Sequence, residues 1–231
     1  MGAITAVGFD ADDTLWHNER FFRLTQVRFA ELLSDHAPPG HLEERLIAAE
    51  RRNVGRYGFG IKGFVLSMIE TAIEVTGEKV PASVIAELIR AGQEMLSHPI
   101  ELLPGARQAV EALSGHYRLI LITKGDLLDQ ERKLAQSGLG DLFDAVEIVS
   151  EKRAPVYQAI FARHGTGAAE GLMAGNSLRS DVLPMLAAGG WGVHVPHDLT
   201  WALEHEERPE TAARFREVAA IGDLPALIDA L

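Results

Sequence analysis

The chain has 231 residues, 47% of them hydrophobic, which suffices for one large globular domain or for a domain that carries an inserted second one. A formal net charge of −11 and the lack of a basic run argue against nucleic-acid binding. Because there is no cysteine, disulfides, thiolate nucleophiles and cysteine-bound zinc are excluded. No apolar run resembles a signal peptide or a membrane span, so we expect a cytoplasmic protein without membrane contact.

An apolar run near the N-terminus, Ile4 to Phe9, leads directly into an acidic segment. The run is short and contains β-branched residues, which predicts a buried strand with Asp10 and Asp12 just past its carboxyl end. Ligands of open α/β sheets bind at that edge. Two neighbouring carboxylates repel each other unless a cation or a shared proton is present. The segment therefore predicts a nucleophilic carboxylate beside a proton-transferring or metal-binding one, although an Asp-rich turn that caps a helix remains an alternative.

Residues 17–99 show helical periodicity and no convincing strand. A glycine-rich stretch, Gly55 to Gly60, predicts a loop between the second and third helices. We expect a small helical bundle inserted directly behind the acidic segment. The four helices are predicted over about 21–33, 41–52, 62–76 and from 81 to at least 95.

Strands and helices alternate after residue 105. Strands are predicted at 117–123, 145–149, 171–174 and 191–195, and helices at 106–113, 127–136, 155–164, 181–188 and 224–231. Apolar strands separated by helices predict an α/β fold, a doubly wound parallel sheet with right-handed crossovers. Because the first strand joins the same sheet, we expect a core domain of residues 1–16 and 100–231 and a helical cap domain of residues 17–99.

Polar residues follow the ends of the predicted strands. Besides Asp10 and Asp12, these are Thr123, Lys124, Lys152, Asn176 and Asp181. Each has an ordinary alternative explanation as a turn residue, a helix cap or an exposed lysine. Because the carboxyl ends of parallel strands meet at one edge of a sheet, the set as a whole predicts a single site.

The order of these residues resembles the haloacid dehalogenase (HAD) superfamily of phosphohydrolases. The resemblance rests on Asp10-x-Asp12-x-Thr14, on Thr123 after an apolar strand, on Ser150-Glu151-Lys152 and on Gly175-Asn176-Ser177-x-x-x-Asp181. It covers the whole chain, including a helical cap between the first and second motifs. One such motif is a weak signal, whereas four in order at strand ends are specific.

The resemblance implies hydrolysis of a phosphomonoester through an aspartyl-phosphate. Asp10 would be the nucleophile, and Asp12 would protonate the leaving alkoxide and then deprotonate the attacking water. Thr123, Lys124 and Lys152 would bind the phosphate, and Lys152 would also hold Asp10 ionised. Dehalogenases of the superfamily lack the carboxylate that corresponds to Asp12, so its presence favours phosphoryl transfer.

The resemblance also implies a Mg²⁺ site, because the available ligands are hard oxygens. The ligands would come from Asp10, the main-chain carbonyl of Asp12, Asn176 and Asp181. The family commonly has an aspartate where Asn176 stands. Two possibilities therefore stay open: Asn176 coordinates weakly, or Asp181 takes the direct role.

The expected substrate is a small phosphorylated metabolite, and the expected assembly is a monomer or a homodimer. A phosphotransferase or a phosphonatase on the same scaffold is an alternative; a phosphonatase would use a cap lysine, for which Lys62 is the evident candidate. A module that accepts or binds phosphate without turnover is an alternative from another class. Such receiver modules are shorter and lack a helical insert after the first strand.

Overall fold

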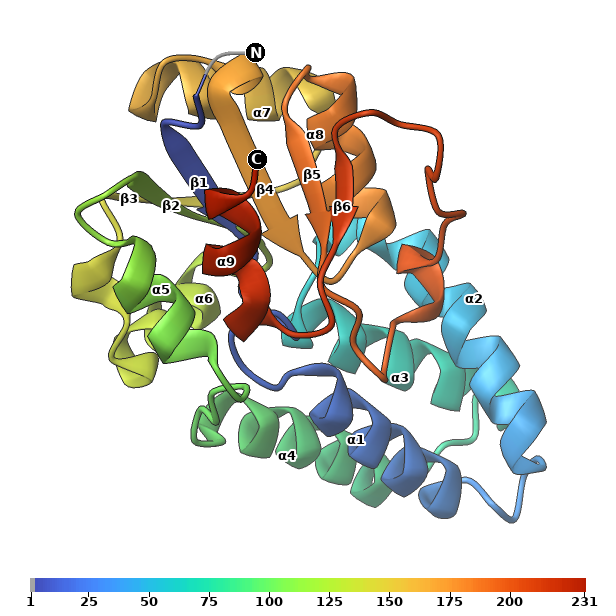
Figure 1. The fold of residues 1–231 in the computed structure, drawn as a ribbon. Helices are drawn as coiled ribbons and strands as arrows, with labels where there is room; N and C mark the ends of the chain where they lie inside the picture. The colour runs from blue at the N-terminus through green and yellow to red at the C-terminus, as the bar shows by residue number, and fades with distance from the viewer. Residues whose placement is uncertain (1–2) are drawn as a thin grey trace. The chain divides into compact units, whose positions relative to one another are not determined.

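The computed structural model describes residues 3–231 and contains a six-stranded sheet (Figure 1). Its strand pairs are parallel, in the order β3-β2-β1-β4-β5-β6. The strands are β1 (Ala6–Phe9), β2 (Arg118–Lys124), β3 (Ala145–Val149), β4 (Gly171–Gly175), β5 (Trp191–His194) and β6 (Phe215–Glu217). The predicted α/β fold with a doubly wound parallel sheet is confirmed.

Strand β1 is central and buried on both faces. Val7 and Phe9 pack into the core on one face, whereas Gly8 faces the other. A Cβ atom at Gly8 would lie 2.9 Å from Sδ of Met173, so only glycine fits without displacing a neighbour. The same alternation directs Asp10, the residue after the strand, to the face of Gly8.

Within residues 3–231, five helices flank the sheet. They are α5 (Ala106–Leu113), α6 (Leu127–Ser137), α7 (Ala154–His164), α8 (Leu183–Ala187) and α9 (Leu224–Asp229). On one face of the sheet, α5 and α9 contribute Val110 and Leu224 to the core, and Leu134 of α6 packs against it. On the opposite face, α7 and α8 contribute Phe161 and Met185 to a second core. Helices on both faces give the three-layer arrangement expected of a parallel sheet.

Short helical turns connect several of these elements. They are η1 (Gly140–Leu142), η2 (Ala168–Glu170), η3 (Leu178–Val182), η4 (Ala202–Glu204) and η5 (Ile221–Asp223). Within residues 3–231, none of the helices combines the length and the apolar character that a bilayer span requires.

The chain divides into two compact units. The sheet unit comprises residues up to Asn18, Ile100–Lys124 and Gln130–Leu231, and the helical unit comprises Glu19–Pro99 and Gly125–Asp129. The helical unit contains α1 (Glu19–Leu32), α2 (Pro39–Tyr57), α3 (Ile61–Val75) and α4 (Ala82–Ser97). These helices enclose a core of their own, which includes Phe29, Leu46, Phe64 and Met68.

Three elements differ from the sequence-based expectation. The glycine-rich loop is shorter, because α2 continues through Gly55 to Tyr57. The helix expected at 181–188 begins earlier, with the π-helical turn η3 (Leu178–Val182). Strand β6 (Phe215–Glu217) was not expected, because three residues are too few to show an alternating pattern.

Candidate active site

The candidate site lies at the topological switch point of the sheet. From β1 the sheet continues through β2 and β3 on one side and through β4, β5 and β6 on the other. In such sheets ligands bind outside the carboxyl ends of the strands where the order reverses. Asp10 directly follows β1, and its main-chain N–H donates to the carbonyl of Ala174 at 2.9 Å, which fixes the residue at this point.

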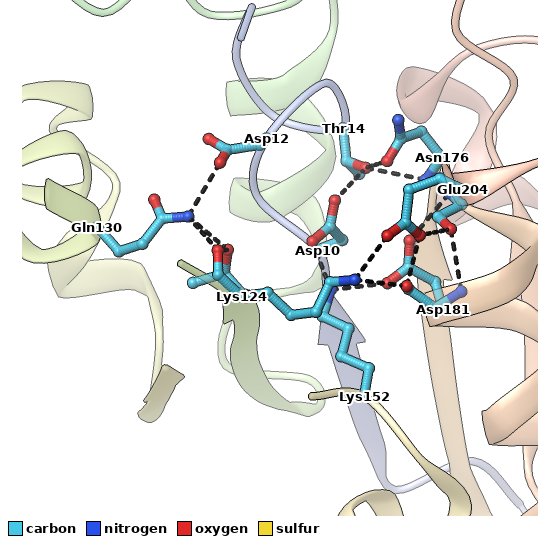
Figure 2. Close-up of polar contacts among 12 residues, drawn as sticks. Asp10, Asp12, Thr14, Lys124, Gln130, Lys152, Asn176, Asp181 and Glu204 are labelled. Atoms are coloured by element: carbon cyan, nitrogen blue, oxygen red, sulfur yellow. Dashed lines mark hydrogen bonds and ion pairs between the residues drawn. The ribbon is translucent and has the colours of Figure 1, made fainter. Parts of the chain in front are cut away.

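A buried lysine joins two of the predicted carboxylates (Figure 2). Nζ of Lys152 lies 2.5 Å from Oδ1 of Asp10 and 2.7 Å from Oδ1 of Asp181. All three residues are at most 6% exposed. The structure thus brings together groups from the ends of β1, β3 and β4 that lie up to 171 positions apart in the sequence.

The two carboxylates share one ammonium, which leaves an excess negative charge. Burial, followed by the charge of Asp181, raises the pKa of Asp10 to about 7, although Lys152 opposes the shift. Burial acts against the charged form of Lys152, but Asp10 and Asp181 outweigh it and raise the pKa of that ammonium above its usual value. The site therefore holds a protonated lysine and favours an additional positive charge.

Thr14 and Asn176 complete this side of the site. Oγ1 of Thr14 lies 3.0 Å from Oδ2 of Asp10 and 3.4 Å from Oδ1 of Asn176, so both oxygens are within reach of one hydroxyl group. Thr14 also accepts a hydrogen bond from the main-chain N–H of Asn176 at 3.0 Å. Oδ2 of Asp181 accepts from the main-chain N–H of Ser177 at 3.0 Å. Two of the expected metal ligands, Asn176 and Asp181, therefore lie on one ordered turn, and Thr14 connects that turn to Asp10.

These donors fit a hard divalent cation. Asp10 and Asp181 supply carboxylate oxygens, Asn176 supplies an amide oxygen, and the net charge of the cluster is negative. Across residues 3–231, no group of three or more His, Asp or Glu side chains is arranged to hold a metal. A metal at this site therefore depends on the amide of Asn176, as well as on the predicted main-chain carbonyl of Asp12.

The carboxylate of Asp12 has different partners. Oδ1 accepts from the indole N–H of Trp16 at 2.7 Å, and Oδ2 accepts from Nε2 of Gln130 at 2.9 Å. Nζ of Lys133 lies 3.0 and 3.1 Å from the two oxygens. Figure 2 shows the Asp12 side chain directed toward Gln130. The two neighbouring aspartates thus have different environments, with Lys152 beside Asp10 and Lys133 beside Asp12.

The side chains of Thr123 and Lys124, at the end of β2, contact different parts of the structure. The hydroxyl of Thr123 accepts from Nε2 of Gln130 at 3.0 Å and is buried in the site. Nζ of Lys124 instead lies 2.7 Å from Oγ of Ser180 and 2.7 Å from Oε1 of Glu204. Thr123 is therefore placed near Asp12, whereas the ammonium of Lys124 is paired with a carboxylate from a distant part of the chain.

Glu204 forms a second buried cluster. Its Oε2 accepts hydrogen bonds from the hydroxyls of Ser177 and Ser180, both at 2.5 Å. Burial acts to raise the pKa of Glu204, but Lys124 and the two hydroxyls outweigh it and lower the pKa. The turn that carries Asn176 and Asp181 is thereby tied to the end of β2.

Sequence reasoning missed several of these residues, among them Gln130, Lys133 and Glu204. Gln130 and Lys133 lie one turn apart on α6, the helix after Thr123. Their spacing of three places both on one face of the helix, which is the signal that could have identified them. Glu204 lies in a polar segment between β5 and β6 that has no regular pattern, and no sequence signal identifies it.

The fold and the site define a class before any comparison is made. An aspartate at the switch point of a parallel sheet, paired with a buried lysine and surrounded by hard oxygens, is an arrangement typical of an α/β enzyme site. A family model for haloacid dehalogenase-like hydrolases matches residues 4–189. The chain belongs to this family of hydrolases, which confirms the resemblance predicted from the motifs, and members of the superfamily generally use a divalent metal ion.

Three known proteins illustrate the relationship. A HAD-like hydrolase from Xanthomonas campestris is 42% identical, with a TM-score of 0.88 over 99% of this chain and 96% of its own. The glyceraldehyde 3-phosphate phosphatase of Methanothermobacter thermautotrophicus is 26% identical over 99% of this chain and 100% of its length. The L-2-haloacid dehalogenase of Xanthobacter autotrophicus is 21% identical, with a TM-score of 0.66 over 99% of both chains, and shares the fold.

Proposed function

We propose that this hydrolase is a Mg²⁺-dependent phosphatase that acts on a small phosphomonoester through an aspartyl-phosphate. The observation that carries the proposal is the buried contact of 2.5 Å between Asp10 and Lys152 at the carboxyl end of β1. A carboxylate with a fixed cation beside it can approach an anionic phosphate that would otherwise repel it.

In the proposed first step, an oxygen of Asp10 forms a bond to phosphorus while the bond from phosphorus to the leaving oxygen breaks. Negative charge is spread over the equatorial oxygens of the phosphoryl group during this transfer. The ammonium of Lys152 and the hydroxyl of Thr123 are the groups that we assign to these oxygens. Both are buried, so neither needs large solvent reorganisation during the reaction.

Asp12 is assigned the proton transfers. It gives a proton to the leaving alkoxide in the first step and removes one from the attacking water in the second. Its carboxylate contacts Gln130, which also contacts Thr123. The proposed acid and the proposed phosphate ligand are therefore connected through one amide nitrogen.

The proposed metal ligands are Asp10, the main-chain carbonyl of Asp12, Asn176 and Asp181. Mg²⁺ bound there would screen the charge of the phosphate and polarise the phosphorus–oxygen bonds. The hard oxygens and the negative charge shared by Asp10 and Asp181 support this choice. Asn176 contributes no charge, so Asp181 supplies the second carboxylate.

Two observations favour a phosphatase over the alternatives. The relative that is 26% identical over its full length is named as a phosphatase. The strand order β3-β2-β1-β4-β5-β6 differs from the 2-1-3-4-5 order of flavodoxin-like receiver modules, which accept phosphate on an aspartate. Lys62, the candidate lysine of a phosphonatase, forms an ion pair with Asp126 at 2.9 Å, and no observation favours that reaction.

The test is phosphate release by the purified protein with Mg²⁺ from p-nitrophenyl phosphate, glyceraldehyde 3-phosphate and a panel of sugar and polyol phosphates. We expect Asp10→Asn to abolish release and the exposed control Asp35→Asn to leave it unchanged. Acid quenching during turnover should trap a phosphoenzyme that is lost in Asp10→Asn. Release of chloride from 2-chloropropionate without phosphatase activity, or full activity of Asp10→Asn, would overturn the proposal.

A further inference from the structure

The carboxylate of Asp12 is surrounded by hydrogen-bond donors to which the proposed reaction assigns no chemical step. Trp16, Gln130 and Lys133 donate to its two oxygens at distances between 2.7 and 3.1 Å. The side chain of Lys133 is 7% exposed, and Gln130 is 3% exposed. Burying an ammonium or an amide costs free energy unless the group has fixed hydrogen-bond partners. For Lys133 and Gln130, those partners include the carboxylate of Asp12.

Gln130 and Lys133 reach Asp12 from the same face of α6, one turn apart. Nε2 of Gln130 also lies 3.0 Å from Oγ1 of Thr123 and 2.6 Å from the carbonyl of Lys124. The amide therefore fixes the distance between Asp12 and the end of β2. A shift of Asp12 toward or away from Thr123 would break at least one of these hydrogen bonds.

Lys133 has a second anchor in the sheet unit. Its Nζ lies 2.8 Å from Oδ1 of Asn18, whose main-chain N–H donates to Oδ1 of Asp13 at 2.8 Å. Asp13 has a positive φ of 59°, which belongs to the tight turn after Asp12. Lys133 thus contacts the carboxylate of Asp12 directly and is linked through Asn18 to the turn at Asp13.

We propose that Lys133 and Gln130 are positioning residues for the general acid and base: they hold the carboxyl group of Asp12 beside Thr123, and Lys133 pairs with the carboxylate that remains once the Asp12 proton has passed to the leaving oxygen. This inference rests on the proposed phosphatase function. It predicts that the loss of kcat/KM on replacing Lys133 increases with the need of the leaving group for a proton. A leaving group that departs readily as an anion makes little use of Asp12 and therefore of Lys133.

The test is a series of phosphomonoesters with leaving groups from 2,4-dinitrophenol through p-nitrophenol and phenol to an alkyl alcohol. The parameter to compare is kcat/KM, because it reports the steps up to departure of the leaving group. We expect Lys133→Met to lower kcat/KM about 100-fold for the alkyl phosphate and less than about threefold for the dinitrophenyl ester. Lys133→Arg, which keeps a donor pair for the carboxylate, should restore most of the loss.

A double-mutant cycle separates positioning from a general structural effect. In the Asp12→Asn background, we expect Lys133→Met to cause no further loss of kcat/KM with p-nitrophenyl phosphate. Gln136→Met, at an exposed position of the same helix, is the matched control and should leave all substrates unchanged. If Lys133→Met does not fold, Gln130→Met gives the same comparison, with the same dependence on the leaving group.

The outcomes distinguish this inference from the proposed function. A wild-type enzyme that releases phosphate from no ester overturns both. A wild-type enzyme that is active, together with equal losses for all leaving groups in Lys133→Met and Gln130→Met, overturns the positioning role alone. Additive losses in the double-mutant cycle would do the same.

Discussion

The ammonium of Lys152 lies 2.5 Å from the carboxylate of Asp10, and both residues are at most 6% exposed. Lys152→Met would leave the carboxylates of Asp10 and Asp181 buried without a cation. Breaking a buried ion pair in this way costs about 3–5 kcal/mol. We therefore expect the melting temperature of Lys152→Met to fall by roughly 10 °C, with loss of phosphate release. Lys79→Met, at an exposed lysine, should change neither calorimetry nor activity.

The second prediction concerns the stability of the metal-free protein. Burial and Asp181 raise the pKa of Asp10 from 3.8 to about 7. The folded state therefore binds a proton that the unfolded state releases, so stability is lost as the pH rises through this window. We expect Asp10→Asn in EDTA to be more stable than the wild type at pH 8, by a few kcal/mol, and equally stable near pH 4. Urea unfolding at both pH values measures this, and a less stable variant at pH 8 would contradict it.

The third prediction concerns Glu204, whose pKa is lowered below 4.5 because Lys124 and the two serine hydroxyls outweigh burial. A lowered pKa contributes stability that is present above pH 4.5 and is lost as the pH falls through the folded-state pKa. We expect Glu204→Gln to lower the free energy of unfolding by about 1–3 kcal/mol at pH 7. The difference in the free energy of unfolding between the variant and the wild type should become smaller below pH 4.5. Glu206→Gln, exposed on the same segment, serves as the control, and a difference that widens in acid would be inconsistent with the geometry.

The fourth prediction tests the close approach of Gly175 to Asp181. A Cβ atom at position 175 would overlap the Asp181 carboxylate, which must then shift from the position where it contacts Lys152. We expect Gly175→Ala to raise the Mg²⁺ concentration needed for half-maximal activity about tenfold or more. Gly55→Ala, in the exposed part of α2 where nothing lies within 4 Å, should leave the metal response unchanged. Unchanged metal dependence in Gly175→Ala would argue against Asp181 as a ligand.

The sheet could be predicted from the sequence because its strands are continuous apolar runs separated by helices. The buried strand β2 was placed to within one residue for this reason. Strand β6 could not be placed, because Phe215–Glu217 is short, polar and at the edge of the sheet. The start of η3 was also missed, since a π-helical turn leaves no distinct periodicity.

The residues of the site that could be predicted lie within a few positions of a strand end. Asp10, Lys152 and Asp181 meet because parallel strands end at a common edge. The environment of each group was not predictable in this way. Lys124 also lies at the end of a strand, yet its ammonium is paired with Glu204, which comes from an irregular segment 80 positions away.

The central position of β1 has a consequence for how the chain folds. Its partner strands begin at Arg118 and Gly171, so β1 cannot complete its pairing on both sides until both have been synthesised. The helical unit has its own core within Glu19–Pro99, built from contacts that are local in sequence. Local contacts form quickly, whereas long loops must close before the sheet can assemble. We expect Asp10, which follows β1, to leave the ribosome before both partner strands of β1 and to reach its final place only after they have paired.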